Sequence, residues 1–560
     1  MSDISRIKSR LKFLYPEEHD DVYRRLQDIL ARYDFEDVSA GNKEIFSEKD
    51  AILICYADHV KAEGNVPLRT MKRFLDRFCS DIISKVHILP FFPYSSDDGF
   101  SVIDYREVNP DFGDWRDVES IGECFGLMFD LVINHVSSKS RWFKGFLDGE
   151  KPYKDYFISF DEHVDTSKVF RPRTHPLLTE FETAEGKRLL WTTFSADQID
   201  LDFSNPDVLL EMIDVLLFYL EKGADTIRLD AIAFLWKKLG TSCMHLEETH
   251  EVVKLFRDVI EHIAPGRWII TETNVPHKDN VSYFGDGDDE AHLVYNFTLP
   301  PLLLYTLLKE DASLLSRWAD SLELPSNKTT FFNFTASHDG IGLTPLKDIV
   351  PDDEIIELAE DVKEKGGRVN YRDVPGKDPF PYELNAVYMD ALGSDPERFM
   401  LSQAIQLSLK GVPGIYMNSI IGAENWQEGV EKLGYNRAIN RQKFDYNELA
   451  ENLGDDTSKK GKVYKAYARL LDARRNEPSF SPLADQKIID MGKKLFAVLR
   501  GSGDDAIICI HNVALEDCPL NHEKILSTLG AADAVDLLTG EKMPERLGKN
   551  SFVWLKQGKN

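Results

Sequence analysis

The sequence predicts an α/β fold: a (β/α)₈ barrel with insertions after strands 3 and 7, an N-terminal helical extension and a C-terminal β domain. Short apolar runs alternate with amphipathic stretches of helical length from residue 51 onward. Several of these runs end in charged residues, as in parallel barrels that present functional groups at their carboxyl-terminal face. The length of 560 residues is too great for one simple core, so several domains are expected.

Residues 1–48 are predicted to form helices that precede the first barrel strand. Leu11 and Leu14, then Val22 and Leu26, recur at helical spacing among charged residues. We expect this extension to be a packing arm with no catalytic role.

Eight apolar runs are predicted to be the barrel strands. Amphipathic stretches such as 206–222 and 247–263 fill most of the intervals between them and are predicted helices. The runs are 51–55, 84–92, 127–133, 226–229, 268–271, 292–297, 330–336 and 411–416.

Two intervals, after the third and seventh runs, are too long for a helix alone. Loops of that length in a compact domain usually carry function, so both are expected to form the rim of the active site. The tail alternates short apolar runs and is predicted to be a small β domain. The expected segments are the extension 1–48, barrel parts 49–137, 201–342 and 396–484, insertions 138–200 and 343–395, and the C-terminal domain 485–560.

The composition argues against several classes of partner. A net charge of -28, with 95 acidic and 67 basic residues, disfavours binding to nucleic acids and to anionic membranes. The N-terminus is polar and no run approaches 18 apolar residues, so a cytoplasmic protein is expected. The six scattered cysteines are predicted to be reduced core thiols. We expect small-molecule substrates, and the sequence leaves the oligomeric state open.

Three short strings place a carboxylate at the end of an apolar run. They are Ile227-Arg228-Leu229-Asp230, Ile270-Thr271-Glu272-Thr273 and Ser337-His338-Asp339-Gly340. Retaining chemistry at a sugar anomeric centre needs a carboxylate nucleophile and a carboxyl that acts first as acid and then as base. Any one string fits a buried strand followed by a polar loop residue, but three in this order favour a catalytic site.

These strings resemble the catalytic regions of the alpha-amylase family of glycoside hydrolases. The resemblance runs from about residue 50 to the C-terminus, and two further regions, 130–135 and 411–416, fit it. Other stretches narrow it to the sucrose-phosphorylase branch, namely Tyr56-Ala57-Asp58, 86–92, Phe170-Arg171-Pro172-Arg173, 240–243 and Ala438-Ile439-Asn440-Arg441.

The resemblance implies roles for the three carboxylates. Asp230 would be the nucleophile, kept ionised by Arg228, which lies on the same face of an extended strand. Glu272 would be the general acid/base, with a raised pKa. Asp339 would grip sugar hydroxyls and stabilise the cationic transition state.

The resemblance also implies a pocket for one terminal glucosyl unit. The family places an acid against the glucose 4-hydroxyl, and we favour Asp97 over Asp98 for that role. The remaining glucose-binding candidates are Phe100, His135, Arg228, His338 and Arg441. The calcium site of amylases is absent from this branch, and no metal-ligand spacing, Gly-rich phosphate loop or dinucleotide fingerprint occurs, so no cofactor is expected.

The acceptor side distinguishes members of the branch. Arg173 matches the phosphate-binding arginine, and arginine suits bidentate phosphate contact. Sucrose phosphorylases carry Tyr-Gln where this chain has Tyr382-Glu383; this departure, the N-terminal extension and residues 241–247 resemble glucosylglycerate phosphorylases. The expected reaction is therefore retaining phosphorolysis of 2-O-α-glucosyl-D-glycerate. Candidate partners for the glycerate carboxylate are Arg171, Arg173, Arg368 and Arg372.

Other functions remain open at this point. Sucrose phosphorolysis is the main alternative, followed by phosphorolysis of sucrose 6-phosphate or glucosylglycerol. A hydrolase or transglucosidase would not need Arg173. A non-catalytic carbohydrate-binding protein would not need all three acids.

Overall fold

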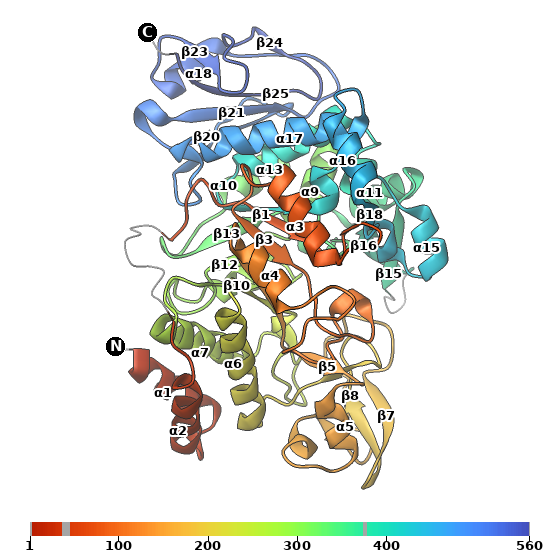
Figure 1. Ribbon diagram of the computed structural model, residues 1–560. Coiled ribbons are helices and arrows are strands. Elements are labelled where there is room, and N and C mark those ends of the chain that lie inside the picture. Colours follow the sequence, from red (N-terminus) through yellow and green to blue (C-terminus); the bar gives the residue numbers. More distant parts are fainter. Residues whose placement is uncertain (1–2, 36–44, 373–377, 559–560) are drawn as a thin grey trace.

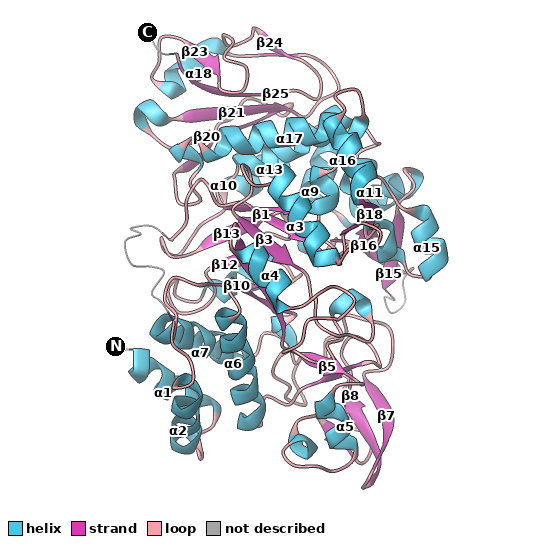
Figure 2. Ribbon diagram, in the orientation of Figure 1, coloured by secondary structure: helices cyan, strands magenta, loops and turns pink. Residues whose placement is uncertain are grey.

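The computed structural model describes residues 3–35, 45–372 and 378–558. A closed barrel of eight parallel strands forms its centre, and helices surround it (Figures 1 and 2). The predicted fold class is confirmed. In order around the barrel, the strands are β1 (Ile52–Cys55), β3 (Lys85–Ile88), β4 (Gly126–Val132), β10 (Ala224–Asp230), β11 (Trp268–Thr271), β12 (Leu293–Tyr295), β13 (Thr330–Asn333) and β17 (Val412–Tyr416).

The strands and helices form where apolar residues have the matching period. Strands β1, β11, β13 and β17 are buried along their whole length, as expected for barrel strands that are covered by helices. Helix α6 begins where Asn205 accepts a hydrogen bond from the Asp207 amide and Pro206 fills the first turn. The main barrel helices are α3 (Pro67–Phe78), α4 (Trp115–Gly122), α6 (Pro206–Glu221), α7 (Glu247–Ile263), α9 (Leu299–Lys309), α13 (Pro396–Ser408) and α17 (Lys459–Arg475).

Two N-terminal helices, α1 (Asp3–Leu14) and α2 (His19–Leu30), lie against α7 and α6 at one end of the molecule (Figure 1). Their apolar stripe is buried against the barrel helices. Arg10 pairs with Glu251 of α7 at 3.2 Å, which ties α1 to the barrel. Residues 36–44 of the predicted extension lie outside the described residues.

Both long intervals carry extra sheets at the carboxyl ends of the strands. After β4, the strands β6 (Ser159–Phe160), β7 (Leu178–Thr183) and β8 (Gly186–Trp191) form one sheet, and β5 (His135–Ser137) pairs with β9 (Gln198–Asp200). After β13, the sheet contains β14 (Ile341–Gly342), β15 (Arg368–Arg372) and β16 (Phe380–Asn385), with α11 (Asp352–Glu364) packed against it.

The C-terminal region forms a five-stranded antiparallel sheet at the end of the molecule opposite to α1 (Figure 1). A second hydrophobic cluster lies between this sheet and α18 (His522–Leu529). The strands, in spatial order, are β19 (Gln486–Ile488), β20 (Leu495–Arg500), β21 (Ile507–Asn512), β25 (Phe552–Gln557) and β23 (Ala534–Asp536).

The cysteine prediction needs one correction. All six cysteines are unpaired and five are buried, but Cys124 is exposed because it follows the end of α4 at the surface. Among the described residues, no helix combines the length and the apolar character that crossing a bilayer requires.

Candidate active site

A cavity of about 460 Å³ lies at the carboxyl-terminal face of the barrel, between the two insertions. The structure brings most of the predicted site residues into its lining, and places Arg228 and Arg441 behind the acids that line it. The predicted residues in the lining are Asp97, Phe100, His135, Arg173, Asp230, Glu272, His338, Asp339, Tyr382 and Glu383.

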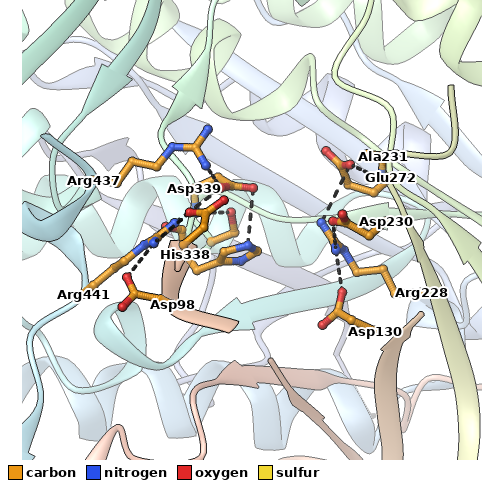
Figure 3. A network of polar contacts seen from close by, with 12 residues as sticks. Asp98, Asp130, Arg228, Asp230, Ala231, Glu272, His338, Asp339, Arg437 and Arg441 are labelled. Atoms are coloured by element: carbon orange, nitrogen blue, oxygen red, sulfur yellow. Dashed lines mark hydrogen bonds and ion pairs between the residues drawn. The ribbon is translucent and has the colours of Figure 1, made fainter. Parts of the chain in front are cut away.

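Asp230 ends β10 and is held by Arg228, which is only 1% exposed. The Arg228 Nη1 atom donates to Asp230 Oδ1 at 2.7 Å and also pairs with Asp130 on the neighbouring strand (Figure 3). Burial raises the pKa of Asp230, and the Arg228 guanidinium counteracts that rise. The contact with Arg228 favours the ionised form of the Asp230 carboxylate, which faces the cavity.

Glu272 follows β11 and lies beside Asp230. Its Oε2 accepts a hydrogen bond of 3.0 Å from the Ala231 amide. Ala231 reaches this position with a φ of 50°, a left-handed conformation that is uncommon for alanine. Burial raises the pKa of Glu272 to about 7, and the charges of Asp230 and Asp339 contribute, although Arg228 opposes the rise. Near neutral pH this carboxyl group can both give and take a proton.

Asp339 sits across the cavity in a second cluster of charges (Figure 3). Burial opposes its ionisation, but the guanidinium groups of Arg437 and Arg441 hold the pKa of Asp339 well below its usual range. His338 Nε2 lies 3.5 Å from Asp339 Oδ2, and burial lowers the pKa of His338 to about 3. Asp339 is therefore a charged acceptor beside a neutral imidazole.

Arg437 is the main site residue that the sequence reasoning missed. Its guanidinium pairs with both Asp339 and Glu383 and lines the cavity. A signal was present, because Arg437 stands four residues before Arg441, at the edge of the quoted motif. Gln198 and Phe194 line the cavity without having been predicted.

The loop that carries Asp97 and Asp98 contributes to the lining of the cavity. Both residues have positive φ, which is uncommon for residues other than glycine. Asp97 lines the cavity, whereas Asp98 turns away and binds Arg441 Nη1 at 2.7 Å and the Tyr435 hydroxyl at 2.6 Å. Arg441 Nη1 lies 3.7 Å from Asp97 Oδ1. The preference for Asp97 as the ligand of the sugar stays a prediction.

Aromatic and imidazole rings form the wall next to these acids. The Phe100 ring stacks on His338 with a centroid separation of 4.8 Å. His135 Nε2 lies 2.9 Å from the Phe100 carbonyl oxygen and 3.2 Å from Gln198 Nε2. These contacts hold the His338 and His135 rings in place.

The two insertions bring arginines to the open side of the cavity. Arg171, Arg173 and Arg372 line it, and within the described ranges none of them makes an ion pair. Arg173 lies 5.9 Å from the centroid of the Phe194 ring. Arg368 does not join them: its Nη2 donates to Gln427 at 3.0 Å. Arg372 stands four positions after Arg368 along β15, roughly 13 Å away, and only the Arg372 end of the strand reaches the cavity.

Among the described residues, no group of three or more His, Cys, Asp and Glu side chains is arranged to hold a metal ion. The buried Lys237 ammonium instead lies between Asn134 Oδ1 at 2.6 Å and Asp200 Oδ2 at 2.7 Å. A protein cation therefore already satisfies these two oxygens beside the active site.

Comparisons with known proteins agree with this geometry. A model of the alpha-amylase catalytic domain matches residues 82–336. The chain is 48% identical to a glucosylglycerate phosphorylase of Spirochaeta thermophila, covering 92% of this chain and 90% of that one, and 49% identical to one of Escherichia coli, covering 83% and 85%. The crystal structure of a sucrose 6F-phosphate phosphorylase from Thermoanaerobacter thermosaccharolyticum superposes with a TM-score of 0.75 at 28% identity, covering 85% of this chain and 95% of that one.

Proposed function

The chain belongs to the alpha-amylase family, among its glucosylglycerate phosphorylases, and on this premise we propose that it phosphorolyses 2-O-α-glucosyl-D-glycerate. The products are α-D-glucose 1-phosphate and D-glycerate, and the reaction is reversible. The arginines on the open side carry the proposal for this site. In a protein of net charge -28, Arg171, Arg173 and Arg372 face the cavity without an ion pair among the described residues, which suits anionic acceptors.

The first half of the reaction transfers the glucosyl unit to the protein. The Asp230 carboxylate attacks the anomeric carbon while Glu272 protonates the departing glycerate oxygen. Asp97, His135 and Asp339 accept or donate hydrogen bonds at the sugar hydroxyls. The negative charge of Asp339 stabilises the cationic transition state.

The second half releases the glucosyl unit onto phosphate. Phosphate occupies the face that glycerate has left, where Arg173 holds it, and its oxygen attacks the anomeric carbon. Glu272 takes up the proton of the attacking phosphate oxygen, and the bond between the anomeric carbon and the Asp230 carboxylate breaks. Two inversions at one carbon give net retention, so α-D-glucose 1-phosphate is the product.

The pH dependence of the reaction tests the role of Glu272. This carboxyl must carry a proton to help glycerate depart, and its pKa is raised to about 7. We expect kcat/KM for glucosylglycerate to fall as the pH rises through that value. An activated donor such as α-D-glucosyl fluoride needs no protonation, so its kcat/KM should not show the same decline. A shared decline for both donors would assign the titration to another group.

Donor preference tests the function itself. With phosphate present, glucosylglycerate should give α-D-glucose 1-phosphate faster than free glucose, with a clearly higher kcat/KM than sucrose. The measurement is product analysis by NMR together with initial rates on both donors. We expect this preference because Glu383 replaces the glutamine expected for sucrose. A preference for sucrose would instead support sucrose phosphorolysis. Release of glucose from maltose-type donors, without glucose 1-phosphate from either donor, would contradict the phosphorylase function.

A further inference from the structure

Glu383 lies on β16, at the boundary between the acceptor side and the glucosyl side of the cavity. Its side chain is only 5% exposed. Arg437 donates to it through Nε at 3.2 Å and through Nη2 at 2.7 Å, in a two-point fork. Asn370 Nδ2 adds a third hydrogen bond at 3.0 Å. An ionised carboxylate is an acceptor only and repels other anions, so this group is poorly suited to bind glycerate or phosphate directly.

Arg437 also contacts Asp339, on the glucosyl side of the cavity. Its remaining terminal nitrogen, Nη1, donates to Asp339 Oδ1, so one guanidinium bridges the two carboxylates. Glu383 occupies space that opens because residue 340 is glycine: a Cβ at Gly340 would approach Glu383 Cγ to 2.5 Å. Asn436, next to Arg437, donates to Asn370 at 2.6 Å and closes the network.

We propose that Glu383 is a positioning residue for glucosyl transfer, which acts by holding the Arg437 guanidinium against Asp339. Its fork fixes the plane of the guanidinium and leaves Nη1 pointing at the Asp339 carboxylate. Asp339 is thereby oriented before the sugar arrives, which lowers the cost of reorganisation in the transition state. The inference rests on the proposed glucosyl transfer, but not on which acceptor is used.

The test measures glucosyl transfer without an anionic acceptor. Hydrolysis of α-D-glucosyl fluoride, with neither phosphate nor glycerate present, is followed for wild type, Glu383→Gln, Arg437→Lys and the double variant. In Glu383→Gln the amide NH₂ faces an N–H group of Arg437, so only one bond of the fork can persist. We expect kcat to fall about tenfold or more while the KM for the fluoride changes less than about threefold. The double variant should fall no further than Arg437→Lys, within about twofold.

The matched control is Glu290→Gln, because Glu290 is also a buried acid in an ion-paired cluster but lies away from the cavity. Its kcat on the fluoride should equal that of wild type. Gly340→Ala provides a second route to the same loss, since it displaces Glu383 without removing a charge. Thermal melting of each variant identifies any that fail to fold. If Glu383→Gln is one of them, Gly340→Ala serves as the test variant in its place.

Two results would overturn the inference. One is an unchanged kcat on the fluoride with a raised KM for phosphate or glycerate, which would make Glu383 a direct acceptor ligand. The other is additive losses in the double variant, which would show that Glu383 and Arg437 act independently. Failure to form glucose 1-phosphate from glucosylglycerate would count against the proposed function alone, because the fluoride assay involves neither compound.

Discussion

Replacing Asp230 with asparagine should reduce phosphorolysis of glucosylglycerate by about 10⁴-fold or more, because an amide cannot form the glucosyl ester. Arg228 would then keep Asp130 as a partner but lose its ion pair with the nucleophile. The measurement is kcat under saturating phosphate, together with mass spectrometry for the covalent glucosyl intermediate. Near-normal turnover of Asp230→Asn would require another nucleophile.

Two variants make this result specific. Asp225→Asn changes an acid on the same strand, at the opposite end, where Asp225 pairs with Lys85 at 2.6 Å, and should leave kcat unchanged. Glu272→Gln should lose most activity on glucosylglycerate but retain activity on α-D-glucosyl fluoride, since the fluoride leaves without protonation. Equal losses on both donors would contradict the division of roles between the two carboxyls.

Replacing Arg173 with alanine should raise the KM for phosphate by about tenfold or more and shift the product from glucose 1-phosphate toward glucose. Phosphate attacks the glucosyl-enzyme in preference to water only if a cation holds it beside the anomeric carbon. Formation of that intermediate does not involve phosphate and should be largely intact. Initial rates at varied phosphate, with both products quantified, measure the effect.

The control is Arg368→Ala, which removes an arginine from the insertion after β13. Arg368 binds Gln427 and lies outside the cavity, so the KM for phosphate and the product ratio should stay at the wild-type values. A phosphate KM unaffected by Arg173→Ala would move the phosphate site to Arg171 or Arg372.

The sequence predicted the barrel and its acids because both depend on local patterns. A parallel strand ends at the same face as its neighbours, so Asp230 and Glu272 had to meet there. Contacts between distant loops follow no such rule. Arg437 reaches Glu383 from a segment 54 residues away, and strand β15 decides that Arg372 faces the cavity while Arg368 does not. Such pairings depend on loop paths that periodicity does not encode.

Under the proposed function, the three arginines that line the cavity, Arg171, Arg173 and Arg372, have a kinetic consequence. The proposed donor is a small glucoside, so the protein does not slide from one linkage to the next along a polymer. Each turnover therefore starts with a new diffusional encounter. In the proposed reaction both incoming substrates are anions, and the protein carries a net charge of -28, so long-range repulsion opposes their approach. We expect these arginines to attract the anions locally and so to raise the fraction of encounters that succeed.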